Sequence, residues 1–420
     1  MRKMLITPSR LLVVATTAIA LVAGLPYARA LVTTDDPDPV GWSKQYPKQY
    51  ETYMMTAKTA ELVDYKKFGL YGGADNFQRL DLFPLYKRLF AGHPFALDYK
   101  EDRGHMAALF DMTSTKRMGD NKPGSCLNCK TSQFTMIQQK IGVSKAASTL
   151  TKDLMVEHNV KYSVNCADCH DQKTMALRVE RPAFIEAMAR QGVDVKKASK
   201  SEMRTYVCAQ CHVEYYFKAP DRVVVHPWDK GMGVDAMEKY YDEIGFKDWE
   251  HAETKAPLVK MQHPEFELFS SSIHAKSGVS CSDCHMPSER DSSGKRVTDH
   301  WIRSPLTNLE KACSSCHDYE PEELKERVLT IQNRTFELLT SAEEAIVEAQ
   351  DAIKEAMAKG AKDDALAKAR ALQRKAQIRW DYVAAENSMG FHSPQESARI
   401  LGKSIDYARQ AEIAAFKAAK

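Results

Sequence analysis

The ten cysteines of this 420-residue chain fall into five Cys-x-x-Cys pairs, and this feature limits the folds open to the chain more than any other. Four pairs are followed at once by His: Cys166, Cys169 and His170; Cys208, Cys211 and His212; Cys281, Cys284 and His285; Cys313, Cys316 and His317. The first pair, Cys126 and Cys129, is followed by Lys130. No cysteine remains for a structural disulfide or a lone nucleophile.

Three kinds of site use such pairs. Structural zinc sites take two pairs, or one pair with a distant pair of His. Redox dithiols of thioredoxin type usually come as one motif on a βαβ unit, whereas Cys-x-x-Cys-His attaches haem c through two thioethers and supplies an axial imidazole. His makes up only 13 of the 420 residues, so four coincidences are very improbable. The pattern favours haem over zinc and disulfide.

The N-terminus has the pattern of a secretory signal peptide. A basic region with Arg2, Lys3 and Arg10 precedes an apolar run, and Ala28-Arg29-Ala30 has the small-x-small pattern of a cleavage site. We therefore expect residues 1–30 to be a signal peptide and the mature protein to lie in the periplasm, because thioether haems are assembled outside the cytoplasm. The alternative is a retained anchor helix, although the apolar run is short for a membrane span.

The charge balance argues against a nucleic-acid partner. Residues 1–30 carry four cations and no acids, so their removal changes the formal net charge from +3 to −1. Five haems would then add ten propionates. A neutral to acidic holoprotein is poorly suited to bind a polyanion.

Long helical periodicity is confined to the C-terminal quarter. Apolar residues recur at helical spacing over 321–359 and 364–386. Ser393-Pro394-Gln395-Glu396 has the pattern of a capping box with Pro at the first helical position, and a third helix would run to about Ala418. We predict a mainly α fold: a multihaem cytochrome c core over 31–320 with few strands, and three long helices over 321–420 that pack on the core and are a candidate dimer interface.

Lys130 sets the first motif apart. A lysine binds iron as the neutral amine, so its pKa must fall by several units through burial and metal binding. If no protein group takes the opposite face, that haem offers an open coordination position. The alternative is that Lys130 is a substitution without function, whose iron finds another ligand. We predict that Lys130 is the proximal ligand of a catalytic haem.

One Cys-x-x-Cys-Lys motif followed by four Cys-x-x-Cys-His motifs in a secreted chain resembles the family of pentahaem, ammonia-forming cytochrome c nitrite reductases. The resemblance extends from about residue 40 to the last helix. Residues 212–217 and 260–265 also resemble the calcium and active-site segments of that family. The resemblance implies reduction of nitrite to ammonium by six electrons at the Lys-ligated haem, which four bis-His haems would supply.

The resemblance further implies one calcium ion beside the Lys-ligated haem. Its ligands would be the side-chain oxygens of Glu214 and Gln262 and the backbone carbonyls of Tyr215 and Lys260. All are hard oxygen donors, which calcium prefers. Without the resemblance, Glu214 and Gln262 would be ordinary polar surface residues.

By the same resemblance, the substrate pocket contains Tyr215, His263 and an arginine, which together with Lys130 make up the catalytic set. Lys116-Arg117-Met118-Gly119 resembles the Arg-x-Gly segment of the family, although the loop from there to Cys126 is short. Arg103 is the alternative, and Arg117 as a plain surface charge is another. A positive pocket concentrates nitrite, and His titrates near neutrality, as a proton donor must.

Four further His would be the distal ligands. The resemblance assigns His300 to the second motif, His105 to the third, His392 to the fourth and His274 to the fifth. We expect His93, His158, His226 and His251 to be non-ligands.

The resemblance also implies a partner that supplies electrons, either a multihaem cytochrome or a membrane quinol dehydrogenase, and a homodimer formed by the long helices. Hydroxylamine, nitric oxide and sulfite are further substrates that such a site could reduce. The rival hypothesis is a pure electron-transfer cytochrome, in which all five irons are six-coordinate.

Overall fold

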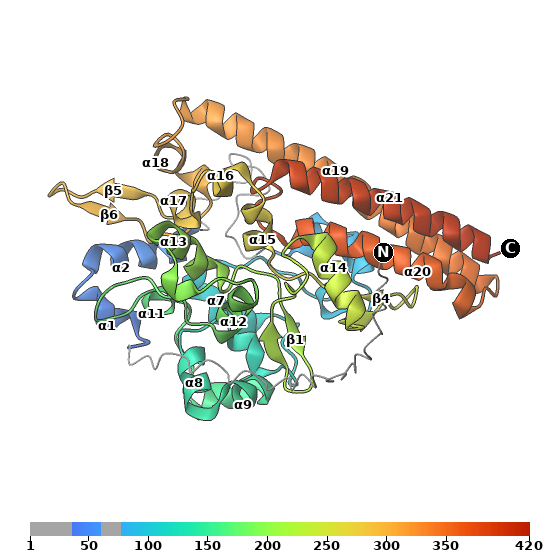
Figure 1. Ribbon diagram of the computed structural model, residues 1–420, viewed down its shortest axis with the longest axis horizontal. Coiled ribbons are helices and arrows are strands. Elements are labelled where there is room, and N and C mark those ends of the chain that lie inside the picture. The colour runs from blue at the N-terminus through green and yellow to red at the C-terminus, as the bar shows by residue number, and fades with distance from the viewer. Residues whose placement is uncertain (1–35, 60–76) are drawn as a thin grey trace, which may run out of the picture.

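The computed structural model describes residues 36–59 and 77–420, and the predicted signal peptide over residues 1–30 lies outside them. The described chain is mainly helical, as predicted (Figure 1). Its first part is built from short α-helices: α1 (Pro39–Ser43), α2 (Pro47–Met54), α5 (Arg79–Leu82), α6 (Tyr86–Leu89), α7 (Ala108–Ser114), α8 (Phe134–Ile141), α9 (Val143–Ser148), α10 (Thr151–Glu157), α11 (Cys166–Cys169), α12 (Pro182–Arg190), α13 (Lys200–Ala209), α14 (Val234–Glu243), α15 (Glu265–Ser270), α16 (Ile273–Lys276), α17 (Cys281–His285) and α18 (Leu309–Ala312).

Single 3-10 turns connect several of these helices. They are η1 (Met55–Lys58), η2 (Pro94–Ala96), η3 (His105–Ala107), η4 (Gly124–Leu127), η5 (Val195–Lys197) and η6 (Pro305–Thr307).

Strands are few and short, again as predicted. In the described part of the chain they form three antiparallel pairs: β1 (Tyr216–Lys218) with β2 (Val223–Val225), β3 (Trp249–Glu250) with β4 (Pro257–Leu258), and β5 (Ser288–Arg290) with β6 (Arg296–Thr298). Tyr216 lies opposite Val225, so the first pair begins directly after Tyr215. This pairing fixes the backbone that follows the third Cys-x-x-Cys-His motif.

The second and fourth motifs each begin with a capping box. In α11 the Asp168 carboxylate accepts the Asn165 amide at 2.8 Å, and in α17 the Asp283 carboxylate accepts the Ser280 amide at 2.7 Å. The acid is thus the residue just before the second Cys of each motif. Because residues three apart share a helix face, one capped turn brings the two thiols to the same side.

Three long helices end the chain, and their bounds lie within two residues of the prediction: α19 (Pro321–Ala358), α20 (Asp363–Ala385) and α21 (Pro394–Ala418). They lie side by side, with α21 packed along both α19 and α20 (Figure 1). The apolar positions that predicted α20, from Leu366 to Val383, are all buried. Within the described part of the chain, no helix combines the length and apolarity that a bilayer crossing needs.

The predicted capping box at Ser393 is wrong, although Pro394 does occupy the first turn of α21. The Ser393 hydroxyl is buried and accepts a hydrogen bond from the Ser271 hydroxyl at 2.8 Å, so it does not cap the helix. The Glu396 carboxylate accepts both Nε and an NH2 group of Arg399 instead of the Ser393 amide. Tertiary contacts have replaced the local ones.

The long helices share a hydrophobic core with the rest of the chain. One cluster contains Phe90, Trp228 and Met261 together with Ile346 and Trp380 from α19 and α20. Residues of 31–320 and of 321–420 therefore pack against one another throughout this cluster.

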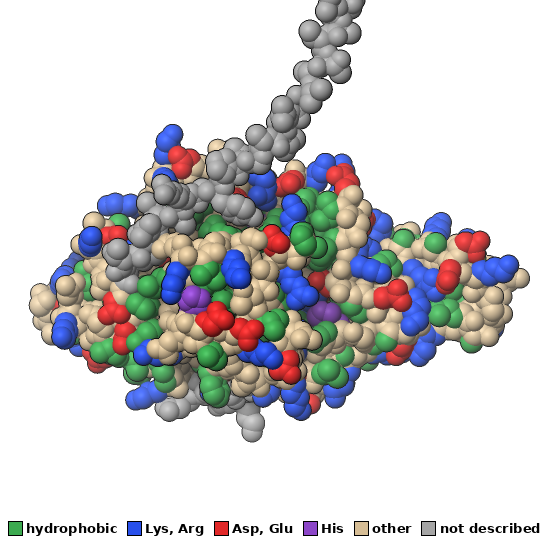
Figure 2. Space-filling view, turned by 90° about the horizontal axis from the view of Figure 1, so that it is seen from below, with side chains coloured by type: hydrophobic (Ala, Val, Ile, Leu, Met, Phe, Trp, Pro, Cys, Tyr) green, Lys and Arg blue, Asp and Glu red, His purple; other side chains and the backbone are tan. Residues whose placement is uncertain are grey.

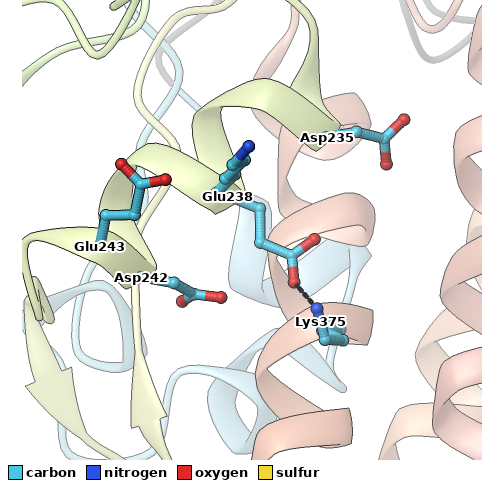
Figure 3. A pocket seen from close by; sticks show the side chains of 6 residues that line it. Asp235, Glu238, Asp242, Glu243 and Lys375 are labelled. Carbon is cyan, nitrogen blue, oxygen red and sulfur yellow. Dashed lines mark hydrogen bonds and ion pairs between the residues drawn. The ribbon is translucent and has the colours of Figure 1, made fainter. Parts of the chain in front are cut away.

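A surface hollow of about 480 Å³ lies where α14 meets α20. Glu238 and Asp242 project into it from α14 and Lys375 from α20 (Figure 3). The Lys375 ammonium is paired with Glu238, and the Asp242 carboxylate accepts Nε of Arg374 at 2.9 Å. These ion pairs join α14 to α20. The charged side chains that line the hollow therefore have a structural role.

Candidate functional site

Four pairs of His rings lie at nearly the same separation. The distances between ring centres are 6.2 Å for His105–His212, 6.2 Å for His170–His300, 6.2 Å for His274–His317 and 6.3 Å for His285–His392. A metal–imidazole bond is about 2 Å long and each ring adds roughly another ångström, so two rings that share one metal have centres about 6 Å apart. The four pairs match the predicted assignments, and their spacing fits an iron between the rings.

The second nitrogen of several of these rings is held by the backbone. Nδ1 of His170 lies 3.0 Å from the Met175 carbonyl oxygen, and Nδ1 of His285 lies 3.0 Å from that of Arg303. His300 makes the same contact with the Thr298 carbonyl at 2.8 Å. Such contacts fix the tautomer and leave Nε2 to the metal, as is usual for His ligands.

Three of the four histidines predicted to be non-ligands have other contacts. Nδ1 of His226 lies 2.8 Å from the Glu214 carbonyl oxygen, and Nε2 of His251 lies 2.9 Å from that of Arg88. Nδ1 of His93 accepts the amide of Phe95 at 3.3 Å.

Contacts between the thiols show how the motifs are arranged in space. The Cys129 thiol of the first motif interacts with Cys211 of the third, and Cys208 of the third interacts with Cys281 of the fourth. The third motif therefore lies between the first and the fourth. The first and third motifs are thus in direct contact, although the second lies between them in the chain.

The structure gathers the predicted catalytic residues around the first motif. Nζ of Lys130 lies 2.8 Å from a carboxylate oxygen of Asp102, and both Arg117 and His263 are near enough to act electrostatically on that carboxylate. Tyr215 lies close to Arg117 and to the thiols of the first motif. Burial raises the pKa of Tyr215 well above its usual value, so its hydroxyl stays protonated at neutral pH.

Arg117 and Arg103, the two candidates for the pocket arginine, have different surroundings. Nε of Arg103 donates to Asp111 at 2.9 Å, so its charge is paired. The Arg117 guanidinium lies 4.0 Å from the ring centre of Phe95, and its Nε donates to the Thr115 hydroxyl at 3.2 Å, a neutral partner. It lines a cavity of about 310 Å³ together with Lys116, Lys122 and one acid, Asp120, so the cations outnumber the anions there. The geometry favours Arg117 as the group available to an anion.

The predicted calcium ligands lie together on two segments. The Glu214 carboxylate is completely buried, and its oxygens accept the Tyr241 hydroxyl at 2.9 Å and the Gln262 amide at 2.5 Å. Burial raises the pKa of Glu214 well above its usual value. The Gln262 side-chain NH2 group donates to the Lys260 carbonyl oxygen at 3.0 Å, so these two predicted ligands are neighbours.

This donor set fits a hard cation, because it combines one buried carboxylate with neutral oxygens. No cluster of three or more His, Cys, Asp or Glu suited to a metal occurs among the described residues. Apart from Glu214, the predicted calcium ligands are therefore amide and carbonyl oxygens.

Sequence reasoning missed several residues of this region. Asp102 contacts Lys130, the Asp381 carboxylate of α20 accepts the Lys260 ammonium at 2.9 Å, and the Glu386 carboxylate is paired with His392. Asp381 was detectable in principle, because it is an acid between the apolar positions Trp380 and Val383 of α20. Asp102 and Glu386 have no comparable signal.

Cationic and anionic side chains are interspersed over the face of the molecule shown in Figure 2, without a broad patch of one sign.

Comparison with known proteins gives a consistent result. The model of the cytochrome c552 family matches residues 38–420. Cytochrome c-552 of Parabacteroides distasonis is 40% identical over 383 residues, which cover 90% of this chain and 76% of that protein. The cytochrome c nitrite reductase subunit NrfA of Nitratidesulfovibrio vulgaris is 36% identical over 417 residues, which cover 92% of this chain and 80% of that subunit.

A solved structure of the same kind of protein matches this chain as well. The catalytic subunit NrfA of cytochrome c nitrite reductase from Desulfovibrio desulfuricans, described with two calcium sites, has a TM-score of 0.84 and 36% identity. The match covers 91% of this chain and 86% of that chain.

Proposed function

Because this chain belongs to the cytochrome c552 family, which includes the cytochrome c nitrite reductases, we propose that it reduces nitrite to ammonium in the periplasm at a haem ligated by Lys130. The chain is an enzyme of the nitrite reductase class. The observation that carries the specific reaction is the gathering of Arg117, Tyr215 and His263 around the one motif that ends in Lys.

Five haem c groups would occupy the five motifs. Four of them would have two His ligands, in the pairs His105–His212, His170–His300, His274–His317 and His285–His392. The common ring separation of 6.2 to 6.3 Å supports this assignment. Haems with both axial positions filled suit electron transfer, and one with a free position suits substrate reduction.

One calcium ion would be held by the Glu214 carboxylate, the Gln262 side-chain oxygen and the carbonyls of Tyr215 and Lys260. The buried Glu214 carboxylate supports this site, since a cation would offset the cost of burying its charge. The ion would also fix both segments that carry the pocket residues, because Tyr215 and His263 directly follow two of the ligands.

Lys130 would hold a haem that, when bound, would supply electrons and a binding site for the substrate nitrogen. The Arg117 guanidinium would hold the nitrite anion, and the neighbouring Lys116 and Lys122 would raise its local concentration. Conversion of nitrite to ammonium takes six electrons and eight protons. The protonated Tyr215 hydroxyl would donate a hydrogen bond to a nitrite oxygen, and His263 would pass protons from solvent.

Electrons would come from a separate multihaem cytochrome or a membrane quinol dehydrogenase. Two copies of the chain would associate through the long helices to form a homodimer. Both statements rest on the family, and sedimentation at several concentrations tests the second.

The direct test is ammonium formation from nitrite with a reduced viologen dye as electron donor. We expect the holoprotein with five haems to form ammonium, and a fully loaded holoprotein that forms none would refute the proposal. Lys130→His should keep the haem and change the rate. His263→Ala should slow turnover with all haems retained, whereas the matched variant His158→Ala should behave as wild type.

The electron-transfer alternative makes an opposite spectroscopic prediction. It requires all five irons to be six-coordinate with protein ligands. A high-spin ferric signal in the electron paramagnetic resonance spectrum, altered by nitrite, would support the enzyme and exclude the pure conduit.

A further inference from the structure

Three successive backbone amides just before His263 each donate to a carboxylate from a different part of the chain. The amides of Lys260, Met261 and Gln262 donate, in that order, to Asp248 at 2.8 Å, Asp381 at 2.8 Å and Glu214 at 2.5 Å. Glu214 has a role in the proposed calcium site, whereas the proposed chemistry assigns none to Asp381. Asp381 is also the one of the three that comes from the long-helix region.

The position of Asp381 is unfavourable for an acid. It lies in the last turns of α20, where the helix dipole disfavours a negative charge, and it is completely buried. A buried carboxylate is costly unless it is paired and hydrogen-bonded. Its two oxygens meet this need by accepting the Lys260 ammonium at 2.9 Å and the Met261 amide at 2.8 Å. Apolar packing alone would favour an apolar residue here.

The Lys260 ammonium links Asp381 to the pocket arginine. It lies 4.8 Å from the ring centre of Phe95 and 5.6 Å from that of Tyr99. The Arg117 guanidinium lies over the same two rings, at 4.0 and 5.8 Å. Cations are attracted to aromatic faces, so this pair of rings is a common support for both side chains.

We propose that Asp381 is a positioning residue for the substrate pocket. It fixes the backbone that carries His263, and it fixes the Lys260 ammonium against the aromatic pair that supports Arg117. One carboxylate of the long-helix region thereby sets the relative placement of the proton donor and the anion-binding group. The inference rests on the proposed function, because it gives His263 and Arg117 the roles stated there.

The test replaces Asp381 by Asn in the holoenzyme, which keeps the size and removes the charge. The matched control is Asp364→Asn, the same substitution at an exposed position of the same helix. Nitrite is titrated into the oxidised protein while the absorbance of the high-spin haem is followed, and the pH profile of kcat is recorded. We expect the Kd for nitrite to rise about 10- to 100-fold in Asp381→Asn, as is typical for residues that orient others, with an altered pH profile. Asp364→Asn should match wild type in both.

A second variant separates positioning from stability. Asp381→Asn leaves the buried Lys260 ammonium without its partner, which can unfold the protein by itself. The double variant Asp381→Asn with Lys260→Met removes both charges, so we expect it to fold with five haems and still bind nitrite weakly.

Either variant would overturn the proposal if it held five haems and kept the wild-type nitrite Kd and pH profile. A double variant that did not fold would overturn it too, because Asp381 would then be structural. If wild type itself bound no nitrite, the proposed function would fail, which is a separate result.

Discussion

Glu343 of α19 allows a quantitative prediction about stability. Its side chain is 4% exposed, and its carboxylate accepts Nε1 of Trp380 at 3.2 Å. Burial raises its pKa from 4.5 to about 7. Between pH 4.5 and pH 7 the folded state therefore keeps a proton that the unfolded state has released.

The sign of the effect follows from this difference. The stability contribution is fully present below pH 4.5 and is lost as the pH rises to 7, at about 1.4 kcal/mol per pH unit, or about 3 kcal/mol in all. Glu343→Gln has no charge at any pH and keeps an oxygen for Trp380. It should therefore be more stable than wild type by about 3 kcal/mol at pH 8 and by less than about 1 kcal/mol at pH 5.

Urea unfolding followed by circular dichroism at pH 5 and pH 8 measures this difference. The control is Glu344→Gln, since the neighbouring Glu344 is exposed and should show no such pH dependence. A Glu343→Gln variant whose stability relative to wild type is the same at both pH values would refute the reasoning, because it would mean that Glu343 is not protonated in the fold.

Three further predictions concern the site. Arg117→Leu should raise the KM for nitrite by about 10- to 100-fold, because a charge-assisted hydrogen bond is lost, and should change the KM for uncharged hydroxylamine little. Steady-state kinetics with both substrates measures the two KM values. Equal increases would contradict the prediction. His300→Ala should add a high-spin signal to the electron paramagnetic resonance spectrum with five haems retained, whereas an unchanged spectrum would exclude His300 as a ligand. Glu214→Gln should weaken calcium binding at least tenfold in calorimetric titration, since the one charged ligand is lost; unaltered affinity would place the ion elsewhere.

The sequence predicted the parts of this fold that depend on local signals. The five motifs are short covalent attachment sequences, and each can be recognised without knowledge of the fold. The long helices were predictable because apolar residues such as Leu366 and Trp380 recur at helical spacing over many turns. A single polar group is a weaker signal, which explains the error at Ser393, where a tertiary hydrogen bond to Ser271 replaces the expected cap.

The pocket required more than local signals. Arg117, Tyr215 and His263 are predictable only from a resemblance, and the pairing of the alternative Arg103 with Asp111 is a contact that no local pattern indicates. The partners of these residues are distant in the chain. The Asp381 carboxylate contacts the segment around Lys260 across 121 residues, and no periodicity in the sequence relates the two.

The end of α20 shows why the long helices are more than a support for the haem region. Within a few residues of that end, Asp381 holds the segment before His263, and the Asn387 side-chain amide donates to Glu265 at 2.7 Å. Glu386 is paired with His392, whose ring centre lies 6.3 Å from that of His285. The helices thus deliver polar groups to two separate parts of the haem region, one at the pocket and one at the fourth motif. A chain shortened before α20 would lose a predicted iron ligand as well as packing, so the long helices and the haem region should form one cooperative unit.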